Sequence, residues 1–219
     1  NNKEEAEKIR SAVEKLPFVV QKIEKRERKR KPQAPYTTSR LQQEAYTRLG
    51  FTAAKTMKIA QRLYEGVELD AQESVGLISY MRTDSVNVAA TAQGEAAKWI
   101  RAQYGNDYLP PSPPVYKSKK GAQEAHEAVR PTSVFRTPEK MRSFLEEDEF
   151  KLYELIWKKF VASQMVPAVD ELTSITIVAG ENYFFRASGK RNLFPGFGIV
   201  FEIESKTASA ETKEAKEKE

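Results

Sequence analysis

The residue best suited to chemistry in this sequence is Tyr80, in the segment VGLISYMRTDS that spans residues 75–85. A phenol titrates near pKa ~10, so a tyrosine is a weak nucleophile at neutral pH. Chemistry at Tyr80 therefore needs one group that takes its proton and another that holds an anion against it. Arg82 lies two residues further on, and its planar guanidinium is a good bidentate donor to an anion.

The single histidine, His126, lies in AQEAHEAVRPT. HEAVR is similar to the zinc-protease pattern H-E-x-x-H, but Arg130 stands where the second histidine must be. The chain has no cysteine and no other histidine, so we reject a zinc protease. A lone histidine is usually structural. If this segment is helical, however, His126 and Arg130 share a face and present two donors to an anion.

Other catalytic patterns are missing from the sequence. It has no serine–histidine–acid set, no glycine-rich phosphate loop and no dinucleotide fingerprint. No D-x-D pair that could hold Mg²⁺ occurs, because the aspartates are isolated: Asp70, Asp84, Asp107, Asp148 and Asp170. The remaining candidates are a tyrosine, an arginine, a histidine and basic helices. Such groups can bind and attack a phosphate, but the sequence shows no metal site beside them.

The composition sets only broad limits. The chain has 219 residues and a formal net charge of +5, from 36 Lys and Arg against 31 Asp and Glu. That excess is mild and does not by itself indicate nucleic-acid binding. The absence of cysteine fits a reducing cytosol. No apolar run reaches the ~20 residues needed to cross a bilayer, and no signal peptide opens the sequence, so we expect no membrane association.

Two helices are predicted in TTSRLQQEAYTRLGFTAAKTMKIAQRLYEG. Ser39 followed by Gln42 is a capping-box pattern, and Gly50 ends the first helix. Thr52 caps a second helix, which Gly66 ends. Helix, glycine-bearing turn and helix form the outline of a helix-turn-helix.

The second of these helices has a basic side. Lys55, Lys58 and Arg62 recur there at helical spacing. The residues that can face a core are Met57, Ala60, Leu63 and Tyr64. From spacing alone, the ordinary interpretation of the three cations is a solvated surface.

The remaining elements alternate between helix and strand patterns. SVGLISYM predicts a short buried strand, and TAQGEAAKWIRAQYG and DEFKLYELIWKKFVASQM predict helices. Residues 1–16 form a further amphipathic helix, which suggests that the sequence begins within a longer protein. Strands are expected at FVVQKIEKRERKRK, in a hairpin that turns at residues 180–182, and at GFGIVFEIE. The tail, residues 205–219, is polar and predicted to be a disordered linker.

These elements predict an α+β protein with more than one domain. Strand patterns lie at both ends of the sequence and helix patterns in the middle. We therefore expect a discontinuous β-rich domain, residues 1–38 with 167–204, and an inserted all-α, helix-turn-helix-like domain, residues 39–166, that carries Tyr80.

Several segments together resemble the type IA DNA topoisomerases, in their bacterial topoisomerase I branch. GLISYMRTDS closely resembles the active-site tyrosine motif of that family, and Met81 after the tyrosine is typical of the branch. Five further segments resemble family blocks in the family's order: PYTTSRLQQEA, GFTAAKTMKIAQRLYEG, AQEAHEAVRPT, LYELIWKKFVASQM and FRASGKRNLFPGFG. Together they cover roughly residues 25–200.

The resemblance implies a reaction and a role for each candidate residue. Tyr80 would attack a phosphodiester of single-stranded DNA to give a 5′-phosphotyrosine, without ATP, and so relax negative supercoils. Arg82 would clamp the scissile phosphate. His126 would contact and position the DNA. Arg130, Asp84 and Ser85 are weaker candidates for the same task. The last group of implied phosphate contacts is Lys55, Lys58 and Arg62.

The resemblance also implies what this sequence lacks. It corresponds to the β-rich arch and the inserted tyrosine domain, whereas the family's Toprim domain, which binds Mg²⁺, has no counterpart here. We expect no metal in this fragment, no activity from it alone, and association with the missing N-terminal domains of the same polypeptide. A monomer in the cytoplasm, associated with the nucleoid, is expected. Ala89 stands where relatives often place a helix-capping serine.

Two other functions remain open from the sequence. A single-stranded DNA-binding module without catalysis would show salt-sensitive binding that Tyr80→Phe leaves unchanged. A structural or protein-interaction domain would not bind DNA at low salt, and the basic stripes argue against it.

Overall fold

The computed structural model describes residues 2–70, 73–117 and 126–201 and divides the chain into two units. The first, called the sheet unit here, comprises residues 1–30 and 168–195. The second, the helical unit, comprises residues 31–167 and the segment from residue 196 onward. The chain is thus a mixture of helix and sheet. The tail predicted to be disordered, residues 205–219, lies outside the described residues.

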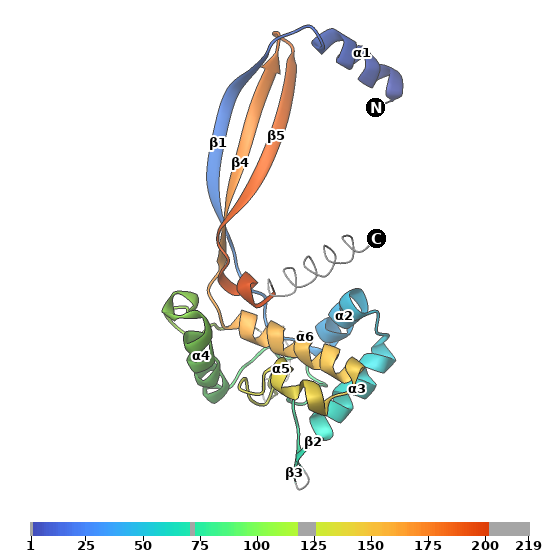
Figure 1. The fold of residues 1–219 in the computed structure, drawn as a ribbon, viewed down its shortest axis with the longest axis vertical. Coiled ribbons are helices and arrows are strands. Elements are labelled where there is room, and N and C mark those ends of the chain that lie inside the picture. Colours follow the sequence, from blue (N-terminus) through green and yellow to red (C-terminus); the bar gives the residue numbers. More distant parts are fainter. Residues whose placement is uncertain (1, 71–72, 118–125, 202–219) are drawn as a thin grey trace, which may run out of the picture. The chain divides into compact units, whose positions relative to one another are not determined.

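The sheet unit consists of one helix and three long antiparallel strands (Figure 1). Helix α1 is Lys3–Val13, and the strands are β1 (Phe18–Arg30), β4 (Ala168–Ala179) and β5 (Tyr183–Phe194). Strand β4 lies in the centre and pairs with β1 on one side and β5 on the other. The β4–β5 hairpin turns at residues 180–182, as predicted, with Gly180 at a positive φ of 61°.

In its described residues, the helical unit contains four longer helices, one short helix and a small hairpin (Figure 1). The longer helices are α2 (Thr38–Leu49), α3 (Ala53–Glu65), α4 (Ala90–Tyr104) and α6 (Glu147–Ser163). Helix α5 is Pro138–Met141, and the hairpin pairs β2 (Val67–Asp70) with β3 (Glu73–Val75). Three 3-10 turns complete the structure, at Asn106–Tyr108, Arg142–Phe144 and Gly196–Gly198.

Helix α6 runs through the core of the helical unit. Its fully buried residues Leu152, Ile156 and Phe160 recur at helical spacing. Trp157 stacks edge-on against Trp99 of α4, with 4.8 Å between the ring centroids, and its indole N–H donates to the Val134 carbonyl at 3.1 Å. Helix α6 packs against α2 and α3, and through Trp157 against α4, so it helps to fix where these helices lie.

Two helix boundaries test the predicted caps. Helix α3 begins after Thr52 and ends before Gly66, as predicted. For α2, the prediction that Ser39 is the N-cap is wrong: Thr37 occupies that position, and its hydroxyl accepts from the Arg40 N–H at 3.4 Å. Because several consecutive residues here are Ser or Thr, the sequence pattern fitted two registers equally well.

Two predicted strands are wrong. GFGIVFEIE is not a strand over its described part: residues 196–198 form a 3-10 turn, 199–201 are helical, and Val200 is buried in the core of the helical unit. Phe197, Val200 and Phe201 have the spacing of a helix face, which burial against that core favours over pairing in the sheet. SVGLISYM is extended only to Val75, where β3 ends.

No described helix is long and apolar enough to span a bilayer.

Candidate active site

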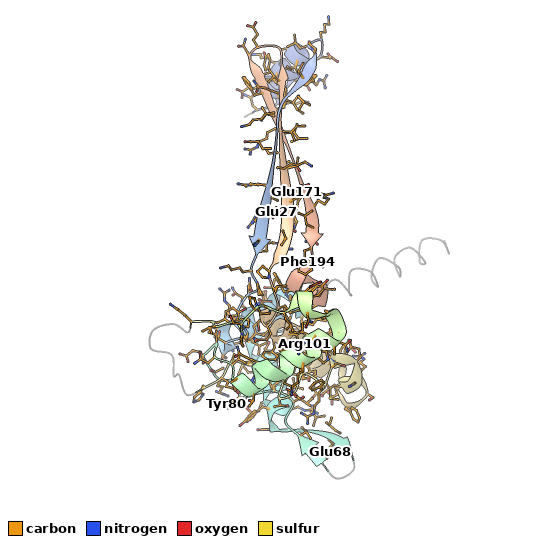
Figure 2. All side chains as sticks on the ribbon, turned by 90° about the vertical axis from the view of Figure 1, so that its left-hand side faces the viewer. Glu27, Glu68, Tyr80, Arg101, Glu171 and Phe194 are labelled. Atoms are coloured by element: carbon orange, nitrogen blue, oxygen red, sulfur yellow. The ribbon has the colours of Figure 1, made fainter. Side chains whose placement is uncertain are left out.

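Tyr80 is an exposed residue on a backbone that its neighbours fix. Its side chain is 41% exposed, whereas Ile78 and Met81 are buried in the core of the helical unit. The Ser79 N–H donates to the Arg130 carbonyl at 2.8 Å, and Ile78 forms an isolated bridge with Pro131. Figure 2 labels Tyr80 in the helical unit. The phenol is therefore accessible while its backbone is held in one place.

The chain just after Tyr80 is fixed by Thr38, the first residue of α2. The Thr38 hydroxyl donates to the Met81 carbonyl at 2.7 Å and accepts from the Thr83 N–H at 2.8 Å. The backbone N–H of Thr38 donates to the Thr83 carbonyl at 2.8 Å. Helix α2 therefore sets the path of the segment that carries Tyr80 and Arg82.

Two aromatic rings flank Tyr80. Tyr64, at the end of α3, meets it edge-on, with 5.3 Å between the ring centroids and 64° between the planes. The His126 ring lies 6.2 Å away by the same measure, tilted by 60°. A shallow cavity of about 290 Å³ is lined by Ser79, Tyr80, His126 and Glu127. The structure thus brings together Tyr80 and His126, which lie 46 positions apart in the sequence.

The expectation that His126 and Arg130 share a helix face is wrong. Residues 126–131 form no helix, and Val129 forms an isolated bridge with Tyr36. Pro131 disfavours a helical conformation in the residue before it. The backbone of this segment instead forms hydrogen bonds with other segments of the same chain. His126 therefore lines the cavity at Tyr80, whereas Arg130 does not.

Arg130 is engaged within the protein. Its side chain is only 13% exposed and pairs with Glu127, at 2.6 Å between Nη2 and Oε2. Its Nη1 donates to the Pro131 carbonyl at 2.9 Å. The other carboxylate oxygen of Glu127 accepts from the Ala89 N–H at 2.5 Å. Arg130 thus holds Glu127, and Glu127 joins the His126 segment to the start of α4.

This contact also explains how α4 begins without a capping side chain. Its N-cap residue is Ala89, which offers no side-chain hydrogen bond to the helix. The Glu127 carboxylate, 38 residues away in sequence, accepts at that end instead and places negative charge at the positive end of the helix. The cap missing from the sequence is therefore compensated by a tertiary contact.

The three other candidates close to Tyr80 in sequence, Arg82, Asp84 and Ser85, lie in different environments. Arg82 is exposed and, among the described residues, makes no ion pair. Asp84 lines a separate cavity of about 560 Å³, together with Arg40, Lys117 and Lys159. Ser85 is fully buried, and its hydroxyl accepts from the Asn87 N–H at 3.1 Å. Ser85 therefore fixes a turn of the backbone in this structure.

The three basic residues of α3 also differ from one another. Lys55 pairs with Asp148 at 2.7 Å and lies over the Phe51 ring. Arg62 pairs with Glu149 at 2.8 Å, and Glu149 is almost fully buried. Lys58 is exposed and makes no ion pair within the part of the chain that is described. The acidic run at the start of α6 thus binds two of the three cations and joins α6 to α3.

The sequence did not identify three residues of this site. Tyr64 was expected in the core, but it is 40% exposed and faces Tyr80. Ser79 joins two chain segments, since its hydroxyl donates to the Ala128 carbonyl at 2.6 Å and accepts from the Arg130 N–H at 2.9 Å. Glu127 was overlooked beside His126. Its position in HEAVR was the only available signal.

Among the residues described, no group of three or more His, Asp or Glu side chains lies close enough together to hold a metal ion.

Comparisons with known proteins give one consistent result. A family model described as DNA topoisomerase matches residues 1–219. The chain is 51% identical over 190 residues to DNA topoisomerase 1 of Xylella fastidiosa, covering 86% of this chain and 23% of that protein. It is 49% identical over 203 residues to DNA topoisomerase 1 of Rickettsia bellii, covering 91% of this chain and 25% of that one.

A solved structure shows the same likeness. Full-length topoisomerase I from Thermotoga maritima matches with a TM-score of 0.78 and 40% sequence identity, over 90% of this chain and 31% of that one. The 219 residues thus span about a quarter of the length of the curated relatives they match.

Proposed function

The chain belongs to the bacterial DNA topoisomerase family, and on this basis we propose that it carries the nucleophile of a type IA topoisomerase, Tyr80. The observation that carries the proposal is the site itself. An exposed tyrosine lies on a rigid backbone, beside a histidine, at an open cavity. A nucleophile held in this way needs little reorganisation to meet a phosphodiester.

The proposed reaction is a transesterification. The Tyr80 hydroxyl oxygen attacks the phosphorus of a single DNA strand, and the bond from phosphorus to the 3′ oxygen breaks. The fragment on the 3′ side of the break remains bonded to Tyr80 through its 5′ phosphate. The other fragment leaves with a 3′ hydroxyl, and the proton that this oxygen gains balances the one that the phenol loses. The reverse attack rejoins the strand. One phosphodiester replaces another, so ATP is not required, and release of negative supercoils can occur while the strand is open.

The residues around Tyr80 supply binding and orientation. Arg82, exposed and without an ion pair in the described chain, is proposed to hold the scissile phosphate and its developing charge. His126 lines the cavity and is proposed to position the strand. Lys58 is the most accessible of the α3 cations for a phosphate contact. Lys55 and Arg62 would have to exchange a carboxylate for a phosphate.

Four residues are proposed as positioning residues instead of contacts to DNA. Tyr64 limits how far the Tyr80 ring can rotate, since an edge-on aromatic contact is worth about 0.5–1.5 kcal/mol. Arg130 and Glu127 hold the His126 segment against α4. Ser85 fixes the backbone beyond Asp84, for which a direct DNA contact remains our proposal.

The complete reaction is proposed to need more than these 219 residues. The family resemblance implies a Toprim domain that binds Mg²⁺, and this chain spans 23% of a relative's length. When bound there, Mg²⁺ would stabilise charge on the phosphate. We therefore propose that the 219 residues do not cleave DNA alone, that the sheet unit belongs to the family's arch, and that the helical unit is the inserted tyrosine domain. We also propose that the protein acts as a monomer on chromosomal DNA in the cytoplasm.

Covalent capture of DNA tests the proposal directly. End-labelled single-stranded DNA is mixed with this chain, with and without a separately produced Toprim-containing segment of a relative and Mg²⁺. We expect an adduct that survives denaturation only in the complete mixture, and none with Tyr80→Phe. The variant should fold normally, because the Tyr80 hydroxyl makes no hydrogen bond to any described residue.

The alternative function, a single-stranded DNA-binding module without catalysis, gives a different result. It predicts salt-sensitive binding that is equal for the wild type and Tyr80→Phe, and no adduct even when association of the two segments is demonstrated.

A further inference from the structure

The positive charge of this chain is concentrated in the sheet unit. Strands β1, β4 and β5 together hold nine Lys and Arg against four Asp and Glu. That surplus equals the net charge of +5 of the entire chain, so the other residues are formally balanced. The excess of cations is therefore located on three strands, away from the α3 cations that the sequence suggested.

One face of the sheet carries a groove. Arg26, Leu172 and Lys190 are cross-strand partners, and so are Lys22, Thr176 and Arg186. Because side chains alternate between faces, these two rows lie on the same face, with Ser174 between them. The groove has a volume of about 500 Å³ and is lined by Glu24, Lys25, Arg26, Leu172, Thr173, Ser174, Arg186, Ser188, Gly189 and Lys190.

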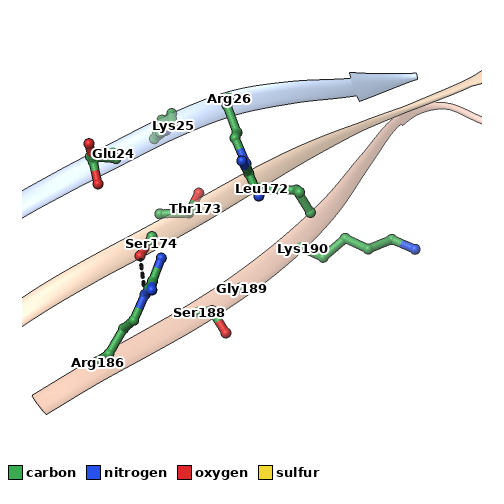
Figure 3. A pocket seen from close by; sticks show the side chains of 10 residues that line it. All are labelled: Glu24, Lys25, Arg26, Leu172, Thr173, Ser174, Arg186, Ser188, Gly189 and Lys190. Atoms are coloured by element: carbon green, nitrogen blue, oxygen red, sulfur yellow. Dashed lines mark hydrogen bonds between the residues drawn. The ribbon is translucent and has the colours of Figure 1, made fainter. Parts of the chain in front are cut away.

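The two arginines of the groove reach toward the central strand from opposite edges. Figure 3 shows Arg26 extending from β1 toward Leu172 and Arg186 extending from β5 to Ser174. The Arg186 Nε donates to the Ser174 hydroxyl at 2.9 Å, which fixes that guanidinium and leaves its terminal nitrogens available. Two guanidinium forks therefore lie over one strand of the sheet.

These arginines are not neutralised by carboxylates. Neither Arg26 nor Arg186 makes an ion pair within the described residues, whereas Lys190 pairs with Asp170 at 3.4 Å. The single carboxylate of the groove, Glu24, pairs with Lys22 at 2.8 Å. The pKa of Glu24 is lowered first by that Lys22 contact and further by the charges of Arg186 and Arg26, so the field of both arginines reaches this point.

The chemistry of the lining fits a phosphate backbone and offers unpaired bases no stacking surface. Guanidinium forks and hydroxyl groups donate to phosphate oxygens. No aromatic side chain lines the groove, so it offers no surface on which bases could stack. Gly189 leaves the floor open, since an added Cβ there would meet nothing within 4 Å. The charged groups of the lining therefore favour a ligand that is held through its own negative charge.

We infer that this face of the sheet, around Arg26 and Arg186, is a second nucleic-acid site that binds the phosphate backbone of a duplex independently of sequence. A duplex is expected because its phosphates are denser than those of a single strand, and the groove offers nothing to unpaired bases. The inference does not depend on chemistry at Tyr80. It adds a site with a preference opposite to the single strand proposed at Tyr80.

The test compares two double variants of the 219-residue chain. Arg26→Gln/Arg186→Gln removes both forks. Lys29→Gln/Arg191→Gln removes the same charge from the same two strands, but from the opposite face. Binding of a fluorescent duplex of arbitrary sequence is measured by anisotropy over a salt series. Circular dichroism checks that both variants fold.

We expect the Arg26/Arg186 variant to lose about tenfold in duplex affinity at low salt. The slope of log affinity against log salt should fall by about 2, one unit for each phosphate contact. The opposite-face variant should change affinity less than about twofold. Equal losses in the two variants, or no loss in either, would overturn the inference.

A second measurement uses the unmodified chain and so does not depend on folding of a variant. Phenylglyoxal modifies accessible arginines, and mass spectrometry locates them. Bound duplex should protect Arg26 and Arg186 but not Arg191, which lies on the other face. Protection of Arg191 in place of the other two would refute the site. Covalent capture by Tyr80 is read separately, so failure of one proposal leaves the other standing.

Discussion

The helical unit and the sheet unit differ in how far their side chains are buried. In the helical unit, apolar residues from α2, α3, α4 and α6 form one continuous core, and the exposed Tyr80 lies on a backbone that this core fixes. In the sheet unit, both outer strands are largely exposed along their length. Figure 2 shows side chains projecting from the strands around Glu27 and Glu171. Packing thus fixes the proposed nucleophile in one unit, whereas ion pairs and backbone pairing support the other.

The difference shows where each kind of function can reside. Cleavage requires a side chain held to within a fraction of an ångström, which a packed core provides. Binding of a phosphate backbone requires only charge at roughly the right spacing, which an open sheet provides. The cations of α3 illustrate the same rule, because two of them are committed to carboxylates inside the packed unit.

Matched isoleucine truncations should give the largest difference between the units. Ile156 of α6 is fully buried, so Ile156→Ala should lower the free energy of unfolding by about 2–5 kcal/mol. Ile23 of β1 is 57% exposed, so Ile23→Ala should cost less than about 1 kcal/mol. Urea unfolding followed by Trp fluorescence reports on the helical unit, and hydrogen exchange of β4 amides reports on the sheet. Similar costs at the two positions would contradict the comparison.

The next effect concerns the contact between Glu127, Arg130 and α4. Glu127→Gln keeps the shape of the side chain but removes the charge that pairs with Arg130 and caps α4. Because Glu127 is partly exposed, we expect a modest loss of about 1 kcal/mol in stability. We also expect a slower rate of covalent capture, by roughly tenfold, with little change in DNA affinity.

Glu154→Gln is the matched control for this change. Glu154 pairs with Lys158 on α6 at 3.1 Å, is similarly exposed, and takes no part in the site. It should leave the rate of capture unchanged. An equal fall in rate for both variants would assign the effect to general stability and not to the position of His126.

Acid should weaken the sheet unit through Asp170, which is buried between the strands. Hydrogen bonds from Arg30, at 2.7 Å, and from Asn192, at 2.9 Å, lower the pKa of Asp170 to about 2. Because this folded-state pKa lies below the ordinary value, the contribution to stability is complete above about pH 4 and is lost as the pH falls toward 2. Hydrogen exchange of β4 amides from pH 7 to pH 3 would follow it.

Asp170→Asn provides the comparison for that experiment. The variant should be less stable than the wild type at neutral pH. The difference should narrow below about pH 4, because there Asp170 of the unfolded wild-type chain takes up a proton before the folded protein does. A difference that stays constant over the whole range would show that the ionised carboxylate is not what holds these strands.

The smallest predicted effect concerns the ring beside the nucleophile. Tyr64→Leu removes the edge-on contact with Tyr80 but keeps an apolar side chain of moderate size. If the ring contact that orients Tyr80 is worth about 0.5–1 kcal/mol, its loss should slow the capture of DNA two- to fivefold. Tyr46→Leu, an exposed tyrosine on α2, is the control. A tenfold or larger loss at Tyr64 would instead indicate a direct contact with the DNA.

Local features of this protein were readable from the sequence. Thr52 and Gly66 bound α3 because a threonine satisfies free amide groups at a helix start and glycine tolerates its end. The period of 3.6 in α6 and the turn at residues 180–182 were predicted for equally local reasons. The family itself was identified from short motifs, of which the one around Tyr80 is the most specific.

Tertiary packing, by contrast, determined which residues meet. The segment 126–131 forms isolated bridges instead of a helix because its backbone finds partners in Tyr36 and Ile78. Arg130 turns inward to Glu127, and Tyr64 turns outward to Tyr80, although spacing suggested the reverse for both. Periodicity reports whether a side chain can face a core, but its actual neighbours come from segments distant in sequence. The sequence therefore pointed to Tyr80 as the proposed nucleophile and determined most helices of this protein, and packing determined the surroundings of that tyrosine.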